Sequence, residues 1–256
     1  MSVAFVKAKL FPHFRCMKVK NHYDNHLGNF YSWMVGEFNL KQEEQQDFFS
    51  NSGIKPFKTK TAIDLGCGHG LQSVSLARLG FKVHAIDFNK QLLKELGVRK
   101  KDLPIFIREA GIIEFLKEFN EQADAVVCMG DTLTHLDNAE AVDQVIRESY
   151  RKLEADGKLV LSFRDLSSAL ADDQRFLPVR SDSSRVHTCF LEYFDDRVHV
   201  YDLLHEWDGK TWKQSVSWYP KLRLSESVVV GMISQCGYRS IERSVINGMI
   251  FLVALK

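Results

Sequence analysis

The feature that most constrains this chain is a short apolar strand that runs into a glycine-rich turn. Residues 62–70 read Ala-Ile-Asp-Leu-Gly-Cys-Gly-His-Gly, and a helical pattern of apolar residues begins at Leu71. Glycines permit a tight strand-to-helix turn, and they let a ligand lie against bare backbone. The dinucleotide pattern of dehydrogenases needs a third glycine at position 71, which is leucine here. The turn therefore predicts an α/β protein with another kind of ligand site, although an ordinary strand–helix turn is the plain alternative.

Three further strands are predicted, and each ends in acidic or glycine residues. Residues 82–87 end in Asp87, about twenty residues past the turn, where related folds hold a ribose diol. The strand over 104–108 precedes Glu109-Ala110-Gly111, and the strand over 124–129 precedes Gly130-Asp131-Thr132. Parallel strands end at one edge of a sheet, so these residues predict a crevice there. Alternatively, Asp87 caps the helix that begins near Asn89.

The rest of the chain predicts how this sheet is covered. Residues 21–49 are helical and rich in aromatic side chains, and 158–163 form a fifth strand. Three antiparallel strands are predicted over 185–194, 197–207 and 211–219, because Asp208-Gly209 is a strong hairpin signal. A helix over 225–236 and a hairpin over 238–256 complete the chain.

We therefore expect a doubly wound, mostly parallel α/β sheet of seven strands. An N-terminal helical cap and a three-stranded antiparallel insertion after strand five are expected to overhang the strand ends. The insertion lies outside the parallel sheet, because its short connections exclude parallel crossovers. The expected segments are a cap at 1–58, the ligand-binding core at 59–166, the insertion at 167–222, and a helix with a hairpin at 223–256 that completes the core.

Composition excludes several classes of protein. The 256 residues carry a formal net charge of +1, which argues against a nucleic-acid-binding field, although the first twenty residues hold five Lys or Arg and no acid. No apolar run reaches membrane-spanning length, and the start lacks a signal-peptide core. Five cysteines without a Cys-x-x-Cys pair favour the reducing cytoplasm. No metal is expected, because His22 and His26 have helical spacing but no Cys or acid completes a set.

The turn and several later segments resemble a known family. Asp-x-Gly-x-Gly-x-Gly at 64–70 resembles the first motif of class I methyltransferases, which bind S-adenosylmethionine. From about Tyr23 to about Ser227 the chain looks like the glycine N-methyltransferase branch of that class. The similar segments are Gly80-Phe81-Lys82-Val83, Met129-Gly130-Asp131-Thr132-Leu133-Thr134-His135-Leu136, Phe163-Arg164-Asp165 and Ser217-Trp218-Tyr219-Pro220. The branch has asparagine at the position of Asp131, and the insertion differs in length.

The resemblance implies S-adenosylmethionine as cofactor and a set of residues that hold it. Asp64 would organise its amino-acid end, Asp87 its ribose, and Phe88 would lie beside the adenine. The other expected contacts are Gly66, Cys67, Gly68 and Gly70 in the turn, Glu109, Ala110 and Gly111 at the adenine edge, Met129 and Gly130 beneath it, and Tyr23, Tyr31 and Trp33 in a helix that closes over it. The plain alternative for the aromatic residues is the apolar seam of a docked helix.

Three residues are the catalytic candidates. Asp131 and His135 are candidate bases for removing a proton from an amine. Arg164 would bind a carboxylate of the acceptor, as the resemblance implies and as its planar fork suits. His135 as a structural histidine, and Arg164 paired with Asp165 or Asp131, are the alternatives.

The expected function is S-adenosylmethionine-dependent methyl transfer to a small-molecule acceptor, with an amine nitrogen as the acceptor atom. An O-methyltransferase for a small carboxylate or hydroxyl is one alternative, and a cofactor-binding module without turnover is another. An RNA or protein methyltransferase that uses the basic start for docking fits the near-zero net charge least well. The sequence indicates no oligomeric state.

Overall fold

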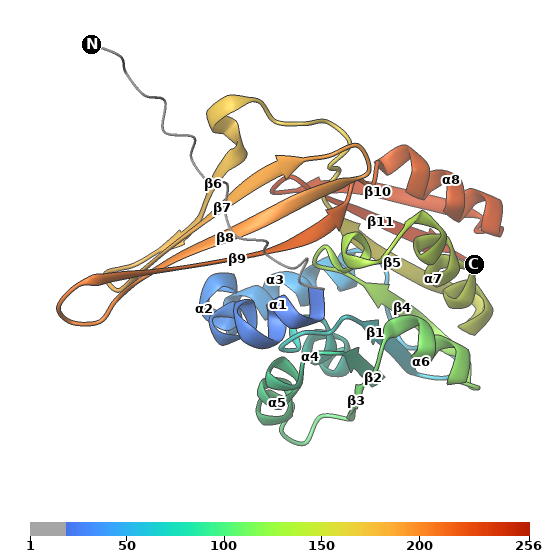
Figure 1. Ribbon diagram of the computed structural model, residues 1–256. Helices are drawn as coiled ribbons and strands as arrows, with labels where there is room; N and C mark the ends of the chain where they lie inside the picture. The colour runs from blue at the N-terminus through green and yellow to red at the C-terminus, as the bar shows by residue number, and fades with distance from the viewer. Residues whose placement is uncertain (1–18) are drawn as a thin grey trace, which may run out of the picture.

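The protein contains one large, mostly parallel sheet with helices on both faces (Figure 1). The computed structural model describes residues 19–256. The strand order is β10-β11-β5-β4-β1-β2-β3. Strands β1 to β5 pair in parallel, whereas β11 runs antiparallel to β5 and β10 antiparallel to β11. The strands are β1 (Thr61–Leu65), β2 (Lys82–Asp87), β3 (Ile105–Glu109), β4 (Ala123–Cys128), β5 (Leu153–Phe163), β10 (Ser240–Ile246) and β11 (Met249–Leu255). The expected seven-stranded sheet is confirmed.

The strand order reverses at β1, and this reversal positions the site. From β1 the chain adds β2 and β3 on one side, then crosses over and adds β4 and β5 on the other. The first helices after β1 and β4 therefore cover opposite faces. Open α/β sheets bind ligands outside the carboxyl ends of the strands at such a point.

Two apolar cores fill the two faces of this sheet. The helices α3 (Phe38–Asn51), α4 (Leu71–Arg78) and α5 (Lys90–Arg99) pack on one face, through side chains such as Phe49, Val74 and Leu96. The helices α6 (Ile112–Glu118), α7 (Ala139–Lys152) and α8 (Glu226–Cys236) pack on the other, through Phe115, Ile146 and Ile233 among others. Every residue of β1 and β4 is buried, as expected for strands covered on both sides.

A second, antiparallel sheet projects from the main one (Figure 1). It contains β6 (Phe176–Ser181), β7 (Arg185–Tyr193), β8 (Arg197–Trp207) and β9 (Trp212–Leu222) in that order, and η3 (Asp172–Arg175) precedes it. The three expected strands are present, and β6 is a fourth that the sequence did not indicate. Pro178 lies within β6, and proline is tolerated there because β6 is an edge strand.

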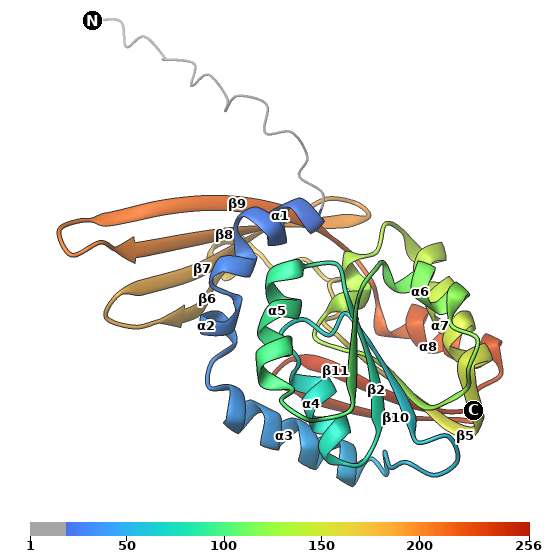
Figure 2. The same cartoon turned by 90° about the horizontal axis from the view of Figure 1, so that it is seen from below.

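The aromatic N-terminal region is broken into short helices instead of one. These are α1 (Val19–Asn25), η1 (Leu27–Asn29), α2 (Tyr31–Val35) and α3, and Gly36, with a φ of 103°, separates the last two. Figure 2 shows α1 lying along β9 of the second sheet, and Leu27 and Phe30 pack against Leu204 of β8. Residues 1–18, which include most of the basic start, lie outside the described residues. Across residues 19–256, no helix is both long and apolar enough to cross a membrane.

Candidate active site

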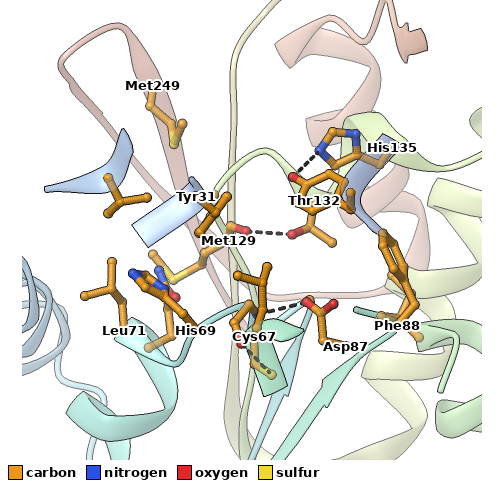
Figure 3. A pocket seen from close by; sticks show the side chains of 18 of the residues that line it. Tyr31, Cys67, His69, Leu71, Asp87, Phe88, Met129, Thr132, His135 and Met249 are labelled. Carbon is orange, nitrogen blue, oxygen red and sulfur yellow. Dashed lines mark hydrogen bonds between the residues drawn. The ribbon is translucent and has the colours of Figure 1, made fainter. Parts of the chain in front are cut away.

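A cavity of about 610 Å³ opens at the carboxyl ends of β1, β2 and β4 (Figure 3). This volume lies in the usual range for small-molecule sites. Twelve of the expected site residues line it: Tyr23, Tyr31, Gly66, Cys67, Gly68, Asp87, Phe88, Gly111, Met129, Gly130, His135 and Arg164. They come from the N-terminal helices, the glycine turn and the ends of β2, β4 and β5. The cavity is therefore formed by the region that the sequence predicted.

The three glycines of the turn have different structural roles. A Cβ on Gly66 would lie 2.5 Å from the Thr132 side chain, and one on Gly70 would lie 2.3 Å from Leu96. A Cβ on Gly68 would meet only Tyr31 and Leu92, at 3.8 Å or more. Gly70 does not line the cavity, because Leu96 fills the space beside it. A Cβ at Gly68 would therefore make only ordinary van der Waals contacts at the cavity wall.

Asp87 is held at the end of β2 by two backbone donors. Its Oδ2 accepts a hydrogen bond from the Gly68 amide at 2.9 Å, and its Oδ1 accepts one from the Asn89 amide at 2.8 Å. The Asn89 side chain caps α5 by accepting from the Leu92 amide, so Asp87 is not the helix cap. Burial raises the pKa of Asp87, and the backbone donors partly offset that rise. The carboxylate therefore keeps outward lone pairs at the cavity wall for further donors.

His135 lies at the opposite side of the cavity, in η2 (Thr132–His135). The Tyr23 hydroxyl lies 3.4 Å from its Nε2, and its buried Nδ1 has no hydrogen-bond partner within residues 19–256. Burial, followed by the positive charge of Lys221, lowers the pKa of His135 to about 3. The imidazole is therefore neutral at physiological pH, and it is a weak base.

Asp131 lies behind the cavity wall, in an ion-pair network. Its Oδ2 is 2.6 Å from Lys221 Nζ and 3.3 Å from Arg164 Nη1, and its Oδ1 accepts from the Arg164 amide at 2.8 Å. Burial alone would raise the pKa of Asp131, but Lys221 and Arg164 lower it to about 2. Two cations therefore pair with this carboxylate, which does not line the cavity, and the role of Asp131 as a base stays a prediction. Arg164 both pairs with Asp131 and lines the cavity.

Four more expected residues lie away from the cavity. Asp64 is buried under the turn, where its Oδ2 accepts from Ser73 Oγ at 2.6 Å, and burial raises its pKa to about 7. Trp33 donates from Nε1 to Asp182 at 2.5 Å, at the second sheet. Glu109 lies 3.8 Å from Lys90 Nζ, and Ala110 packs against the main core. These four side chains turn away because other partners hold them.

The sequence missed one wall of the cavity. Ile246, Asn247, Met249 and Phe251 line it from the β10–β11 hairpin, and Lys41 and Glu44 line it from α3. Figure 3 shows Met249 across the cavity from Asp87. The signal was the Asn247-Gly248 turn: β11 runs antiparallel to β5, which brings that turn to the carboxyl end of β5.

Comparisons with known proteins show which proteins this chain is similar to. Residues 63–161 match the model of a methyltransferase domain. The glycine/sarcosine N-methyltransferase of Aphanothece halophytica is 26% identical over 130 residues, which is 50% of this chain and 49% of that protein. A ubiquinone biosynthesis O-methyltransferase of Xanthomonas oryzae pv. oryzae is 37% identical over 102 residues, 39% of this chain and 41% of that protein. The chain thus spans about half the length, or less, of these curated relatives.

Solved structures share the fold over most of the chain. CalS10, an amino pentose methyltransferase from Micromonospora echinaspora solved with its cofactor bound, has a TM-score of 0.72 at 13% identity and covers 90% of this chain and 96% of its own. The CcbJ methyltransferase from Streptomyces caelestis has a TM-score of 0.72 at 16% identity, covering 91% and 96%. At such identities the likeness shows the fold. Residues 63–161 thus match a methyltransferase domain, and the chain has the fold that solved S-adenosylmethionine-dependent methyltransferases share.

Proposed function

We propose that this protein transfers a methyl group from S-adenosylmethionine to a small-molecule acceptor, at an amine nitrogen. The observation that carries the proposal is the pair formed by Asp87 and Gly68 at the cavity wall. A carboxylate fixed by backbone N–H groups, beside a glycine that presents bare backbone at the cavity wall, suits a ribose diol and the chain attached to it.

The residues present fit the cofactor. Asp87 would accept from the ribose hydroxyls, with Phe88 and Gly111 near the adenine and Met129 packed beneath it. Gly66, Cys67 and Gly68 would face the amino-acid end. Tyr23 and Tyr31 would close the site, and their rings can shield a positive sulfonium by cation–π contact. Asp64 would act from beneath the turn, through its bond to Ser73, and not by direct contact.

Methyl transfer requires this chain mainly to position the reacting groups. S-adenosylmethionine supplies a methyl group on a sulfonium, whose leaving group is a neutral thioether that needs no acid. Alignment in a water-poor cavity contributes about 7–11 kcal/mol, whereas a general base contributes about 10²–10⁴-fold in rate. Tyr23, Tyr31 and Met129 exclude water, and Arg164 orients the acceptor if it carries a carboxylate.

The neutral state of His135 favours nitrogen as the acceptor atom. An imidazole with a pKa of about 3 can accept a hydrogen bond from a neutral amine, and it repels no cation. A hydroxyl acceptor needs a strong base, and both candidate bases fail that need: Asp131 is paired and His135 is weakly basic. The ubiquinone biosynthesis relative keeps O-methyl transfer as the second candidate.

We propose the four segments 1–58, 59–166, 167–222 and 223–256 as the functional divisions of the protein. A cytoplasmic location is supported by four cysteines that form no disulfide in the described chain. The partner is the small-molecule acceptor, and the near-neutral net charge supports the exclusion of nucleic acid.

An acceptor screen tests the proposal. The full chain is incubated with S-adenosylmethionine and panels of amines, carboxylates and phenols, and release of S-adenosylhomocysteine is measured. We expect turnover with an amine, at a rate that rises with pH as the free amine loses its proton. A carboxylate acceptor with a flat pH profile would support O-methyl transfer instead. Cofactor binding without turnover on any panel would leave only a binding module.

A further inference from the structure

A second cluster of buried polar groups lies where α1 meets the second sheet. His187 and Cys189 alternate on β7 and face the same side, and Asp202 of β8 lies directly opposite Cys189 in the strand register. His22 reaches this group from α1, although its partners are some 165 to 180 residues away in sequence. We call His22, His187, Cys189 and Asp202 the α1–sheet cluster. Its two histidines and its aspartate are at most 1% exposed.

The donor atoms of this cluster converge on one point. Asp202 Oδ1 lies 3.1 Å from His187 Nε2 and 3.0 Å from Cys189 Sγ, and these last two atoms are 3.8 Å apart. On the other side of the carboxylate, His22 Nε2 lies 2.9 Å from Oδ2, and its Nδ1 lies 2.8 Å from Ser217 Oγ. Within residues 19–256, His187, Cys189 and Asp202 are the one group with donor atoms arranged for a metal ion.

These separations match the coordination of zinc. Bond lengths of about 2.0–2.3 Å from Zn²⁺ to N, O and S place tetrahedral ligands roughly 3.3–3.7 Å apart. The observed separations of 3.0 to 3.8 Å span that range. Imidazole, thiolate and carboxylate together suit Zn²⁺ and exclude Mg²⁺ and Ca²⁺, which prefer oxygen alone.

We propose that the α1–sheet cluster binds one Zn²⁺ through His187 Nε2, Cys189 Sγ and Asp202 Oδ1. His22 is a positioning residue, because its Nε2 donates to the second carboxylate oxygen and fixes the carboxylate orientation. Binding joins β7 to β8 and, through His22, holds α1 on the sheet. The neighbouring Tyr23 lines the cavity, so the ion would also stabilise one wall of the active site.

Zinc binding changes where the protons of Cys189 and His187 lie. Burial keeps the Cys189 thiol protonated in the metal-free protein, so Zn²⁺ binding forms a Zn–S bond and releases that proton to solvent. His187 must offer the lone pair of Nε2, with its proton on Nδ1. In the metal-free protein Nε2 carries a proton that it donates to Asp202 Oδ1, so zinc binding replaces this hydrogen bond and shifts the proton to Nδ1, which has no hydrogen-bond partner within the described chain.

Metal titration of the full chain tests the proposal. After chelator treatment, the protein is incubated with Zn²⁺, and with Co²⁺ as a spectroscopic probe. We expect one zinc per chain and a thiolate-to-cobalt charge-transfer band. Cys189→Ser should remove the band and weaken zinc at least about tenfold, whereas Cys236→Ser, the matched control in α8, should change neither. His22→Gln should weaken zinc about 10–100-fold but keep the band at saturating Co²⁺, as a positioning role requires.

No stoichiometric zinc in the wild type, or equal binding by Cys189→Ser, would overturn the proposal. Circular dichroism establishes that each variant folds. If Cys189→Ser does not fold, the cobalt spectra of the wild type and of Cys236→Ser test the proposal. A cobalt–thiolate band in both proteins supports the zinc site, and the absence of the band from both overturns it.

Discussion

The glycine turn of the main sheet and the α1–sheet cluster both gather buried polar side chains, but over very different spans of sequence. Asp87 bonds to Gly68, nineteen residues earlier, and both belong to one β–turn–helix–β unit. His22 bonds to Asp202, 180 residues later, and joins α1 to the second sheet. The first site is therefore built by local chain geometry, and the second depends on how the cap docks on the second sheet.

The largest difference in unfolding free energy is expected between alanine variants of two glycines with nearly equal φ angles. Gly70 in the turn has a φ of 101° and Gly209, between β8 and β9, has 95°, but only Gly70 has a crowded Cβ position. Gly209→Ala should cost about 1–2 kcal/mol of unfolding free energy from backbone strain. Gly70→Ala should cost about 2–5 kcal/mol, because overpacking against Leu96 adds to that strain. Urea denaturation measures both, and equal losses would contradict the packing argument.

The next effect concerns the ion-pair network behind the cavity. Asp131→Asn removes the charge that Lys221 and Arg164 share, so it should lower stability by about 2–3 kcal/mol at pH 7. The folded pKa of about 2 is below the usual value, so this stabilisation is present above about pH 4 and is lost as pH falls toward 2. The difference between wild type and variant should therefore shrink from pH 5 to pH 3. A constant difference would show that Asp131 acts by packing alone.

The contribution of Asp64 to the unfolding free energy is expected to have the opposite pH dependence. Its folded pKa of about 7 is raised, so its stabilising effect is complete below about pH 4 and is lost as pH rises through 7. Asp64→Asn cannot ionise, so the melting temperature of the variant relative to wild type should increase between pH 5 and pH 8. We expect a gain of about 2–3 kcal/mol, roughly 4–12 °C. No change in this relative value would mean that Asp64 is ionised throughout.

The smallest effect distinguishes two aromatic residues that the sequence treated alike. Tyr31 lines the cavity, whereas Trp33 bonds to Asp182 at the second sheet. Trp33→Ala should change the affinity for S-adenosylmethionine less than about twofold, and Tyr31→Ala should weaken it about tenfold, as loss of about 1.4 kcal/mol of aromatic contact would. Fluorescence titration measures both affinities. A larger loss for Trp33 than for Tyr31 would reverse the assignment.

Periodicity and turn residues predicted most of the fold because they are local signals. The strand ends at Asp87 and Glu109 and the hairpin at Asp208-Gly209 are each determined by neighbouring residues. The edge strand β6 was missed, because Pro178 argues against a strand unless its edge position is known. The helical N-terminal region was predicted, but not its division into short helices, one of which ends at Gly36 with a positive φ.

The site was predicted less completely, because side-chain direction depends on packing partners far away in sequence. Asp64 and Glu109 carry the expected chemistry, but Ser73 and Lys90 respectively hold them outside the cavity. Asp131 was a candidate base, and although the sequence offered pairing with Arg164 as an alternative, the contact with Lys221, ninety residues later, was not predictable. The wall formed by Met249 required knowledge of the strand order.

Calorimetric titration with S-adenosylmethionine tests the central claim most directly. The account predicts one binding site per chain in the wild type and in Asp102→Ala, an exposed acid in the loop before β3. Asp87→Ala removes two charge-assisted hydrogen bonds to the ribose, each worth about 1.5–3 kcal/mol, so affinity should fall at least about 100-fold. Equal affinity in Asp87→Ala, or no binding by the wild type, would contradict the account.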